Sequence, residues 1–473
     1  MAESASSLNR CPMHSGSAEP PAGAGRRPVR AKGLPVLGNL PSMMVDPIGT
    51  LARISYRHRG AVVSVPLGPI RLIMPTTPQQ IAHMYFDQWR KYPKGSGGFY
   101  KVVRRVYGDS LVTLDGDSWL ADRRLLQPLF SHRNVDNLMA GMIESLKGGL
   151  DALALRAAQG SPLAVNRELK ALTMNALIRC LFGASPSRDE SEDLGTAALE
   201  VFEVMLRRMF LFFLPNTLPL PSELALRRGL RKLDGILLEH LNRQRGEASP
   251  SHDLISLLLK ARDETTGEPL SLRHIRDELV TFFFAGHETT TMTLGWVLYL
   301  LGRNPRVLEE VTAEVDAVLD GRAPTPESLT RLRYTQQVIQ EALRLYPAAW
   351  IVPRTCGEGD VVDGYAIPPG SVIAINTYAI HRDPELWERP ESFEPERFEH
   401  SSSWPRGMYV PFGGGPRVCI GERFSMAESQ LVLAMFLQRF RLSLASSEEV
   451  PMHGLGVALK PARDILMVCK PRN

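Results

Sequence analysis

The sequence predicts a mainly α-helical protein with smaller β regions, an α+β fold. Two long stretches have the apolar spacing of helices, one over 135–245 and one over 271–305. Short runs of β-forming residues lie between turn signals at 61–74 and again at 361–376. We therefore expect helices to dominate the fold and the strands to form smaller regions.

Length and composition are those of a globular protein. The 473 residues are 44% hydrophobic and 22% charged, which is enough to bury a large core. The length alone suggests about three domains, but no internal repeat or second domain boundary interrupts the chain, so we expect a single domain over 33–473. The net charge of +4 is small for this length and argues against a general nucleic-acid-binding protein.

The N-terminus and the cysteines bear on the compartment. Segment 1–32 is rich in Ala, Ser, Gly, Pro and Arg and has no apolar core of signal-peptide length, so we expect a disordered leader. The most apolar windows, 201–220 and 289–301, are too polar or too short for a transmembrane anchor. Five scattered cysteines without CxxC spacing favour a reducing compartment. These observations predict a cytoplasmic protein.

The first part of the expected domain alternates turns, a helix and a hairpin. The turn-rich segment 33–39 leads into a helix-like stretch that ends near Arg59. Runs of β-forming residues on either side of Gly68, within 61–74, predict a β-hairpin. Segment 94–108 is punctuated by glycines, and we expect a loop there.

The helical pattern over 135–245 is interrupted by a proline-rich break at 214–221. The apolar segment 209–213 comes just before that break. It is open to three interpretations: packing in the core, lining of an access channel, or contact with a membrane surface.

The next helical run begins and ends at recognisable signals. Ser271 is a suitable N-cap, and Gly302 and Pro305 mark the end of a helix that could reach about 45 Å. The His287-Glu288 pair in its middle hints at a zinc-protease helix, but the second histidine that such a site needs is replaced by Thr291. The zinc interpretation therefore fails.

A glycine-rich loop near the C-terminus, 412–421, leads into a predicted amphipathic helix over 422–440. Cys419 lies at the start of that helix, where unpaired N–H groups and the helix dipole lower a thiol pKa and favour a thiolate metal ligand. Arg417 offers a fixed charge to an anionic ligand. The alternatives are a buried apolar cysteine and a simple turn. A phosphate loop is excluded because no Gly-Lys-Ser/Thr ending is present.

The loop matches the pattern Phe-x-x-Gly-x-Arg-x-Cys-x-Gly in full, from Phe412 to Gly421. This pattern resembles the haem-binding signature of the cytochromes P450. The resemblance implies a cytochrome P450 fold, with haem b (iron protoporphyrin IX) between the long central helix and the helix after the cysteine loop. It makes Cys419 the iron ligand and places Phe412, Arg417 and Gly421 in the haem site.

Two further segments resemble parts of a P450 haem site. Trp119 and Arg123 are four residues apart and project from one face of a helix. Alone they could be a core tryptophan and a solvated arginine, but they resemble the family's Trp-x-x-x-Arg pair, which holds a haem propionate. The resemblance implies that Arg354 is a second propionate contact.

The middle of the long helix resembles the family's oxygen-binding segment. There Ala285 and Gly286 leave room for dioxygen, and Thr289 can bond back to the carbonyl of Ala285. The resemblance makes Glu288 and Thr289 the catalytic residues, because they would relay protons. His287 receives no role.

A buried ion-pair scaffold is the last element of the resemblance. Glu341 and Arg344 lie on one helix face, as in the family's Glu-x-x-Arg, and Arg397 lies in a later Pro-Glu-Arg-Phe. The resemblance implies that these three residues support the cysteine loop.

The resemblance extends over residues from about 116 to 421 and implies a haem-thiolate monooxygenase that inserts one oxygen atom from O2 into its substrate. Electrons would come from NAD(P)H indirectly, through a ferredoxin or flavodoxin with its reductase. We expect an acidic carrier to dock on a basic patch of Arg124, Arg133 and Arg423. The enzyme is expected to be a monomer.

The substrate pocket implied by the resemblance is apolar. Phe282, Phe283, Ile351 and Val352 would line it, with 201–221 as a lid. We therefore expect a hydrophobic small molecule such as a terpenoid, fatty acid, steroid or polyketide, and a bacterial type of enzyme. Two alternatives are a peroxide-dependent or rearranging haem-thiolate enzyme and a non-enzymatic haem sensor.

Overall fold

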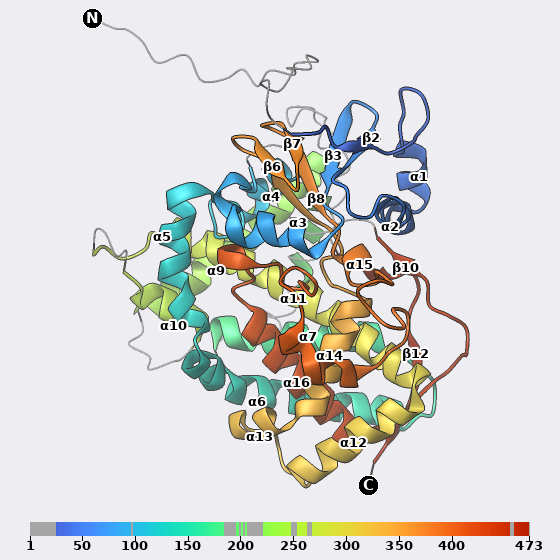
Figure 1. The fold of residues 1–473 in the computed structure, drawn as a ribbon. Helices are drawn as coiled ribbons and strands as arrows, with labels where there is room; N and C mark the ends of the chain where they lie inside the picture. Colours follow the sequence, from blue (N-terminus) through green and yellow to red (C-terminus); the bar gives the residue numbers. More distant parts are fainter. Residues whose placement is uncertain are drawn as a thin grey trace, which may run out of the picture.

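The computed structural model of the chain is mainly helical, and the strands gather in small sheets (Figure 1), as the sequence predicts. In Figure 1, β2, β3, β6, β7 and β8 lie together at one side and most of the long helices at the other. The structure describes residues 25–95, 98–183, 195–197, 200–201, 204–205, 221–246, 253–262, 267–454 and 458–472. The apolar segment 209–213 and most of the expected lid lie outside these residues.

Helix α11 (Leu272–Arg303) crosses the middle of the molecule (Figure 1). The side chain of Ser271 accepts a hydrogen bond from the backbone N–H of His274, so the predicted N-cap is confirmed. Every residue from Thr293 to Leu301 is buried, so this half of the helix is hydrophobic all round and belongs to the core.

Three helices pack against α11, a fourth packs against two of these three, and together they bury the largest apolar cluster of the described residues. They are α6 (His132–Ala157), α7 (Val165–Phe182), α14 (Arg333–Leu345) and α16 (Glu422–Arg439). The sequence predicts α16 as an amphipathic helix, but all residues over 428–437 are buried. The prediction was wrong in that half because α16 has helices on several sides, namely α6, α11, α12 (Pro305–Leu319) and α14.

The larger sheet has the strand order β1-β2-β3-β8-β5. Strands β2 (Val63–Leu67) and β3 (Ile70–Met74) pair antiparallel across Gly68, which has φ +60°, so the predicted hairpin is confirmed. Strand β8 (Val372–Ile375) pairs with β3, and β5 (Val352–Thr355) pairs with β8. This arrangement places Arg354 on the edge strand β5, where the residue is buried.

Strand β1 (Val29–Arg30) lies within the segment 1–32 that the sequence predicts as a disordered leader. It pairs in parallel with β2, and the N–H of Val29 donates to the carbonyl of Val62 at 2.9 Å. The ordered fold therefore begins before residue 33, because these residues complete the edge of the sheet.

Helix α4 (Gly98–Tyr107) occupies the segment 94–108 that the sequence predicts as a loop. Tyr100, Val103 and Tyr107 are buried at helical spacing, and the helix contacts α11. Gly95 lies before the helix, Gly98 is its first residue and Gly108 directly follows its last residue, so none of them interrupts it.

The other elements complete the domain. The helices are α1 (Leu40–Val45), α2 (Pro47–Arg57), α3 (Pro78–Ala82), α5 (Gly116–Leu126), α9 (Pro221–Gly246), α10 (Leu254–Lys260), α13 (Pro326–Arg331) and α15 (Thr377–Ile380), with short turns η1 (His83–Asp87), η2 (Trp89–Lys91), η3 (Gln127–Phe130), η4 (Pro395–Ser403) and η5 (Gly415–Arg417). The strands are β4 (Leu163–Ala164), β6 (Asp360–Val362), β7 (Tyr365–Ile367), β9 (Phe440–Leu444), β10 (Met452–His453), β11 (Lys460–Pro461) and β12 (Leu466–Pro471). In the described part of the chain, no helix has both the length and the apolar character needed to cross a bilayer.

Candidate active site

The middle of helix α11 is accessible at Ala285, Gly286 and Thr289, and this surface is named the notch. Ala285 is exposed although the three phenylalanines before it are buried. The hydroxyl of Thr289 donates a hydrogen bond to the carbonyl of Ala285 at 2.6 Å, one helical turn away. Both residues lie on one face of the helix. The residues of the sequence-predicted oxygen site are therefore small side chains and a hydroxyl group on an accessible face of the helix.

Glu288 follows the notch and is held by a partner that the sequence does not indicate. Its carboxylate forms an ion pair with Lys460 of β11, and only 8% of the residue is exposed. His287 lies on the other side of α11, where Nε2 contacts the carbonyl of Lys170 at 3.1 Å. Burial lowers the pKa of His287, so the neutral ring serves packing there.

The cysteine loop is pressed against η1. Gly415 has φ +65°, and a Cβ at this position would lie 1.8 Å from the carbonyl oxygen of Tyr85. A Cβ on Gly414 would lie 2.7 Å from Cζ of Phe86. The N–H of Cys419 donates to the carbonyl of Phe412 at 2.9 Å, which closes the loop. These two glycines are required because η1 leaves no room for a side chain.

Cys419 keeps accessible surface at the end of this loop. The helix start was expected to lower its pKa, but burial raises the pKa of the thiol. The N–H of Gly421, Arg123 and Lys94 act in the opposite direction, and burial outweighs them. The local helix is thus not sufficient to ionise the thiol, and a bound metal cation would be the main stabiliser of the thiolate.

Arg417, within the cysteine loop, packs against the start of α5. Its Nη2 donates to Asp115 Oδ1 at 2.7 Å, and its guanidinium lies 4.2 Å from the ring centre of Trp119. Its side chain is 5% exposed, and its Nε has no hydrogen-bond partner among the described residues. A buried N–H without a partner is costly, so a further acceptor is expected at this place.

Arg123 contacts the loop rather than Trp119. Its Nη1 donates to the carbonyl of Val418 at 3.0 Å, next to the cysteine. Trp119 instead supports Arg417. The predicted pair is therefore brought to the cysteine loop, but each member has a different contact there.

A second buried group of positive charges adjoins Arg417. Arg354 is 7% exposed, and its Nη1 donates to the carbonyl of Pro353 at 2.9 Å and reaches the hydroxyl of Tyr100 at 3.5 Å. The pKa of Lys94 is well below its usual range because of burial first, and then because of Arg354 and Arg417. Sequence analysis missed Lys94, which only the fold brings to this place.

Even with Lys94 neutral, as its lowered pKa favours, the guanidinium groups of Arg354 and Arg417 outnumber the carboxylate of Asp115 in this part of the described structure. Lys94, Arg354 and Arg417 face Asp115, whose carboxylate also accepts the N–H groups of Lys94 and Gly95 at 3.0 and 2.8 Å. Buried charges need partners of opposite sign. Together with the unpartnered Nε of Arg417, this excess fits a ligand that has carboxylate groups at one edge, and Cys419 fits a ligand that has a metal at its centre.

The comparison with known families decides between the interpretations of this site. The family model "Cytochrome P450" matches residues 28–468. The chain belongs to the cytochrome P450 family. The family implies haem as the cofactor, which agrees with the carboxylate-binding charges and the thiol described above. This P450 is a monooxygenase, as are the relatives named for that activity.

Relatives and solved structures cover almost the whole chain. Cyclooctatin synthase from Streptomyces melanosporofaciens is 33% identical over 94% of this chain and 96% of its own length. Pentalenene oxygenase from Streptomyces avermitilis is 30% identical over 91% and 94%. The crystal structure of the cytochrome P450DA heme domain is 27% identical, covers 95% of this chain and 99% of its own, and has a TM-score of 0.86.

The structure of this P450 brings the three residues of the ion-pair scaffold together. Arg344 donates to both oxygens of Glu341 at 2.7 and 2.9 Å, and both residues are fully buried. Arg397 Nε donates to Glu341 at 3.0 Å. Arg344 also donates to the carbonyl of His381, whose Nε2 accepts the N–H of Val410 at 2.9 Å just before the cysteine loop. His381 therefore connects the scaffold to that loop.

The predicted substrate-pocket residues lie in different surroundings. Phe282 packs against Phe130, with ring centres 5.1 Å apart. Phe283 stacks on His287, on the face of α11 opposite Ala285. Ile351 and Val352 are partly buried against two apolar clusters near the sheet. These contacts do not test the predicted pocket, and the role of the four residues in it stays a prediction.

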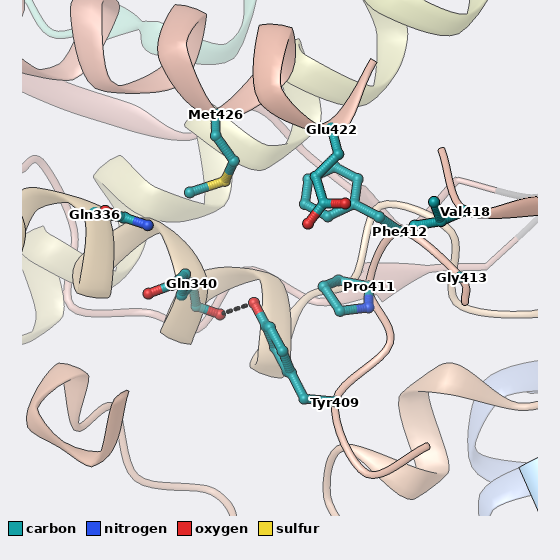
Figure 2. A pocket seen from close by; sticks show the side chains of 9 residues that line it. All are labelled: Gln336, Gln340, Tyr409, Pro411, Phe412, Gly413, Val418, Glu422 and Met426. Carbon is teal, nitrogen blue, oxygen red and sulfur yellow. Dashed lines mark hydrogen bonds between the residues drawn. The ribbon is translucent and has the colours of Figure 1, made fainter. Parts of the chain in front are cut away.

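A small cavity of about 140 Å³ lies between α14, the cysteine loop and the start of α16 (Figure 2). The Tyr409 hydroxyl donates to the carbonyl of Gln340 at 2.9 Å at its wall, and Glu422 and Met426 approach from α16. This cavity does not include Ala285 or Thr289. It is therefore separate from the notch of α11.

Proposed function

We propose that this P450 inserts one oxygen atom from O2 into a hydrophobic small molecule, with a terpenoid as the first candidate. The relatives include terpenoid-modifying enzymes at about 30% identity. The single observation that carries the reaction type is the hydrogen bond from Thr289 to the carbonyl of Ala285 at the exposed notch of α11. An alcohol beside a carboxylic acid is suited to proton delivery.

The residues that hold the cofactor are assigned from the described contacts. Cys419 would be the iron ligand, and Arg417, Arg354 and Lys94 would bind the propionates, whereas Arg123 would fix the loop through Val418. When bound, the haem supplies oxygen activation, with its thiolate ligand favouring cleavage of the O–O bond. The protein supplies binding, orientation and protons.

The proton route uses two neighbouring residues. The hydroxyl of Thr289 is oriented by the carbonyl of Ala285, and a rotation about its side chain would turn its proton toward the notch. The carboxylate of Glu288, held by Lys460, would take up a proton from solvent and pass it to Thr289. Lys460 is 29% exposed along its side chain, so the route reaches solvent.

The electron source is proposed as a separate ferredoxin or flavodoxin with its NAD(P)H-dependent reductase. Arg124, Arg133 and Arg423 are all exposed, and Arg423 is on α16, directly after the cysteine loop. An acidic carrier would be attracted to these positive charges, and the rate of association would depend on salt.

The experiment combines spectroscopy with turnover. The CO-bound, reduced holoenzyme is expected to show the red-shifted Soret band of a thiolate ligand, and candidate terpenoids should shift the spin state on binding. With O2, NAD(P)H and a carrier system, mass spectrometry should find a product that gained one oxygen atom from labelled O2. Product formation with peroxide but none with a redox system would instead support the peroxide-dependent alternative.

A further inference from the structure

A cluster of three potential metal ligands lies outside the haem site. It consists of Asp122 from α5 and of His274 and Glu278 from the first turns of α11. His274 and Glu278 are four residues apart, so they project from the same face of the helix. One ligand atom from each residue lies within 4.8 Å of the others. The proposed oxygenation does not use any of these groups.

The distances in this cluster suit a small cation. His274 Nε2 lies 2.7 Å from Asp122 Oδ1 and 3.9 Å from Glu278 Oε1. Ligand atoms at about 2.0 Å from a tetrahedral zinc ion are about 3.3 Å apart. The two observed distances lie on either side of that value. Small side-chain rotations would therefore bring the three groups into a coordination shell.

The cluster holds buried carboxylate oxygens that have no partner in the described part of the chain. Asp122 is 4% exposed and Glu278 is fully buried. Asp122 Oδ2 and Glu278 Oε2 have no hydrogen-bond partner among the described residues. Within the described ranges, neither carboxylate forms an ion pair with a lysine or an arginine. Each carboxylate lies within ion-pair distance of His274. Burial first, and then Asp122, raises the pKa of Glu278, because two buried carboxylates repel each other.

We propose that Asp122, His274 and Glu278 form a binding site for a divalent transition-metal ion, with Zn²⁺ as the probe of choice. One imidazole and two carboxylates are ligands that zinc accepts, and two negative charges balance the charge of the ion. The side chain of His274 is 30% exposed, so the ion can enter from solvent and keep a water molecule as fourth ligand.

The position of the site gives it a structural consequence. The N–H of Leu111 donates to Glu278 Oε1 at 2.7 Å, and the chain continues from there to Asp115, the partner of Arg417. A bound ion joins α5, the start of α11 and this connecting segment. Zn²⁺ binding therefore raises the thermal stability of the holoenzyme and slows the loss of haem.

The test uses tag-free holoenzyme that has been treated with a chelator and dialysed. Zn²⁺ is titrated by calorimetry, and the melting temperature is followed with and without the ion. We expect one tight equivalent in the wild type and at least a tenfold weaker affinity in His274→Ala and in Glu278→Gln. The glutamine keeps the acceptor for Leu111, so this variant should fold with a normal haem spectrum.

His83→Ala is the matched control. His83 Nε2 also lies 2.7 Å from a carboxylate, that of Asp360, but Lys91 and Tyr92 already donate to this carboxylate. Its loss should leave Zn²⁺ binding unchanged. X-ray absorption should show nitrogen and oxygen ligands at about 2.0 Å. Sulfur ligands, equal loss in the control, or unchanged affinity in folded Glu278→Gln would overturn the proposal. None of these readouts depends on turnover, so failure of the proposed oxygenation would not affect them.

Discussion

The guanidinium of Arg417 lies over the ring of Trp119 at 4.2 Å, and the same guanidinium binds Asp115. Trp119 therefore acts as a platform for a cation that points toward the expected propionates. The resemblance to the family implies that Trp119 is a propionate contact itself. The structure adds a second role, the positioning of Arg417. This role can be tested by variants that keep or remove an aromatic ring at position 119.

We expect Trp119→Phe to retain haem better than Trp119→Ala. A phenyl ring preserves a weaker cation–π contact with Arg417, and such contacts contribute about 0.5–2 kcal/mol. Haem transfer to apomyoglobin should be about 2- to 30-fold faster in the alanine variant than in the phenylalanine variant. Equal rates in the two variants would contradict the platform role.

Loss of Glu341 should destabilise the protein strongly. Glu341→Gln leaves the fully buried Arg344 without its carboxylate, and breaking a buried pair costs about 3–5 kcal/mol. Urea unfolding of the holoenzyme measures the effect. Arg53→Ala removes a pair in which both side chains are about half exposed or more, and it should cost less than about 1 kcal/mol. Similar losses in both variants would refute the prediction.

Glu428 should make stability fall as pH rises. Burial raises its pKa from 4.5 to about 8, so between these values the native state keeps a proton that the unfolded state has released. Rising pH then favours unfolding, and the effect is complete above about pH 8. Glu428→Gln should remove a pH-dependent loss of about 2–4 kcal/mol between pH 5 and 8, whereas Glu448→Gln, exposed on the surface, should not. Parallel pH profiles for the wild type and Glu428→Gln would be the contrary result.

Lys460 should affect coupling of electrons to product. Its ion pair with Glu288 fixes the proposed proton donor, so Lys460→Met should divert more NAD(P)H to peroxide. We expect about a 2- to 10-fold lower product yield per NAD(P)H and a changed pH profile, with partial rescue by Lys460→Arg. Thr289→Ala should produce a similar uncoupling. Unchanged coupling and pH profile in Lys460→Met would exclude its positioning role.

Charge reversal of Arg124 and Arg133 should slow haem reduction by an acidic carrier. The effect should be about tenfold at low ionic strength and should diminish as salt screens the charges. Stopped-flow absorbance measures the rate. The control is charge reversal of Arg322 and Arg463, which are also exposed. It changes the net charge by the same amount and should have little effect on the rate. Equal slowing by both pairs would argue against a specific docking site.

The sequence was most informative where function depends on neighbours in the chain. The Ser271 cap, the Thr289 bond to Ala285 and the β2–β3 hairpin each depend on residues a few positions apart, so a local pattern could predict them. The family's Glu-x-x-Arg motif predicted the scaffold carboxylate Glu341. Its contact with Arg397 is the longer-range part of the same pattern.

The residues that the sequence missed depend on contacts between distant segments. Lys94 meets Arg354 only after β5 joins the sheet, and Lys460 meets Glu288 only when β11 lies beside α11. Asp122 reaches His274 across 152 positions of the chain. The leader prediction failed at β1 for the same reason, since pairing with a distant strand ordered a segment of disordered composition.

The ion pair between β11 and α11 also limits how variants of this enzyme can be assembled. Strands β10 and β11 form a hairpin near the C-terminus, and a chimera that exchanges this hairpin would replace Lys460 as well. A graft intended to change the substrate would then break the ion pair of Glu288, the residue proposed to relay protons. Designers who exchange C-terminal segments between related enzymes should therefore transfer Glu288 and Lys460 as one unit.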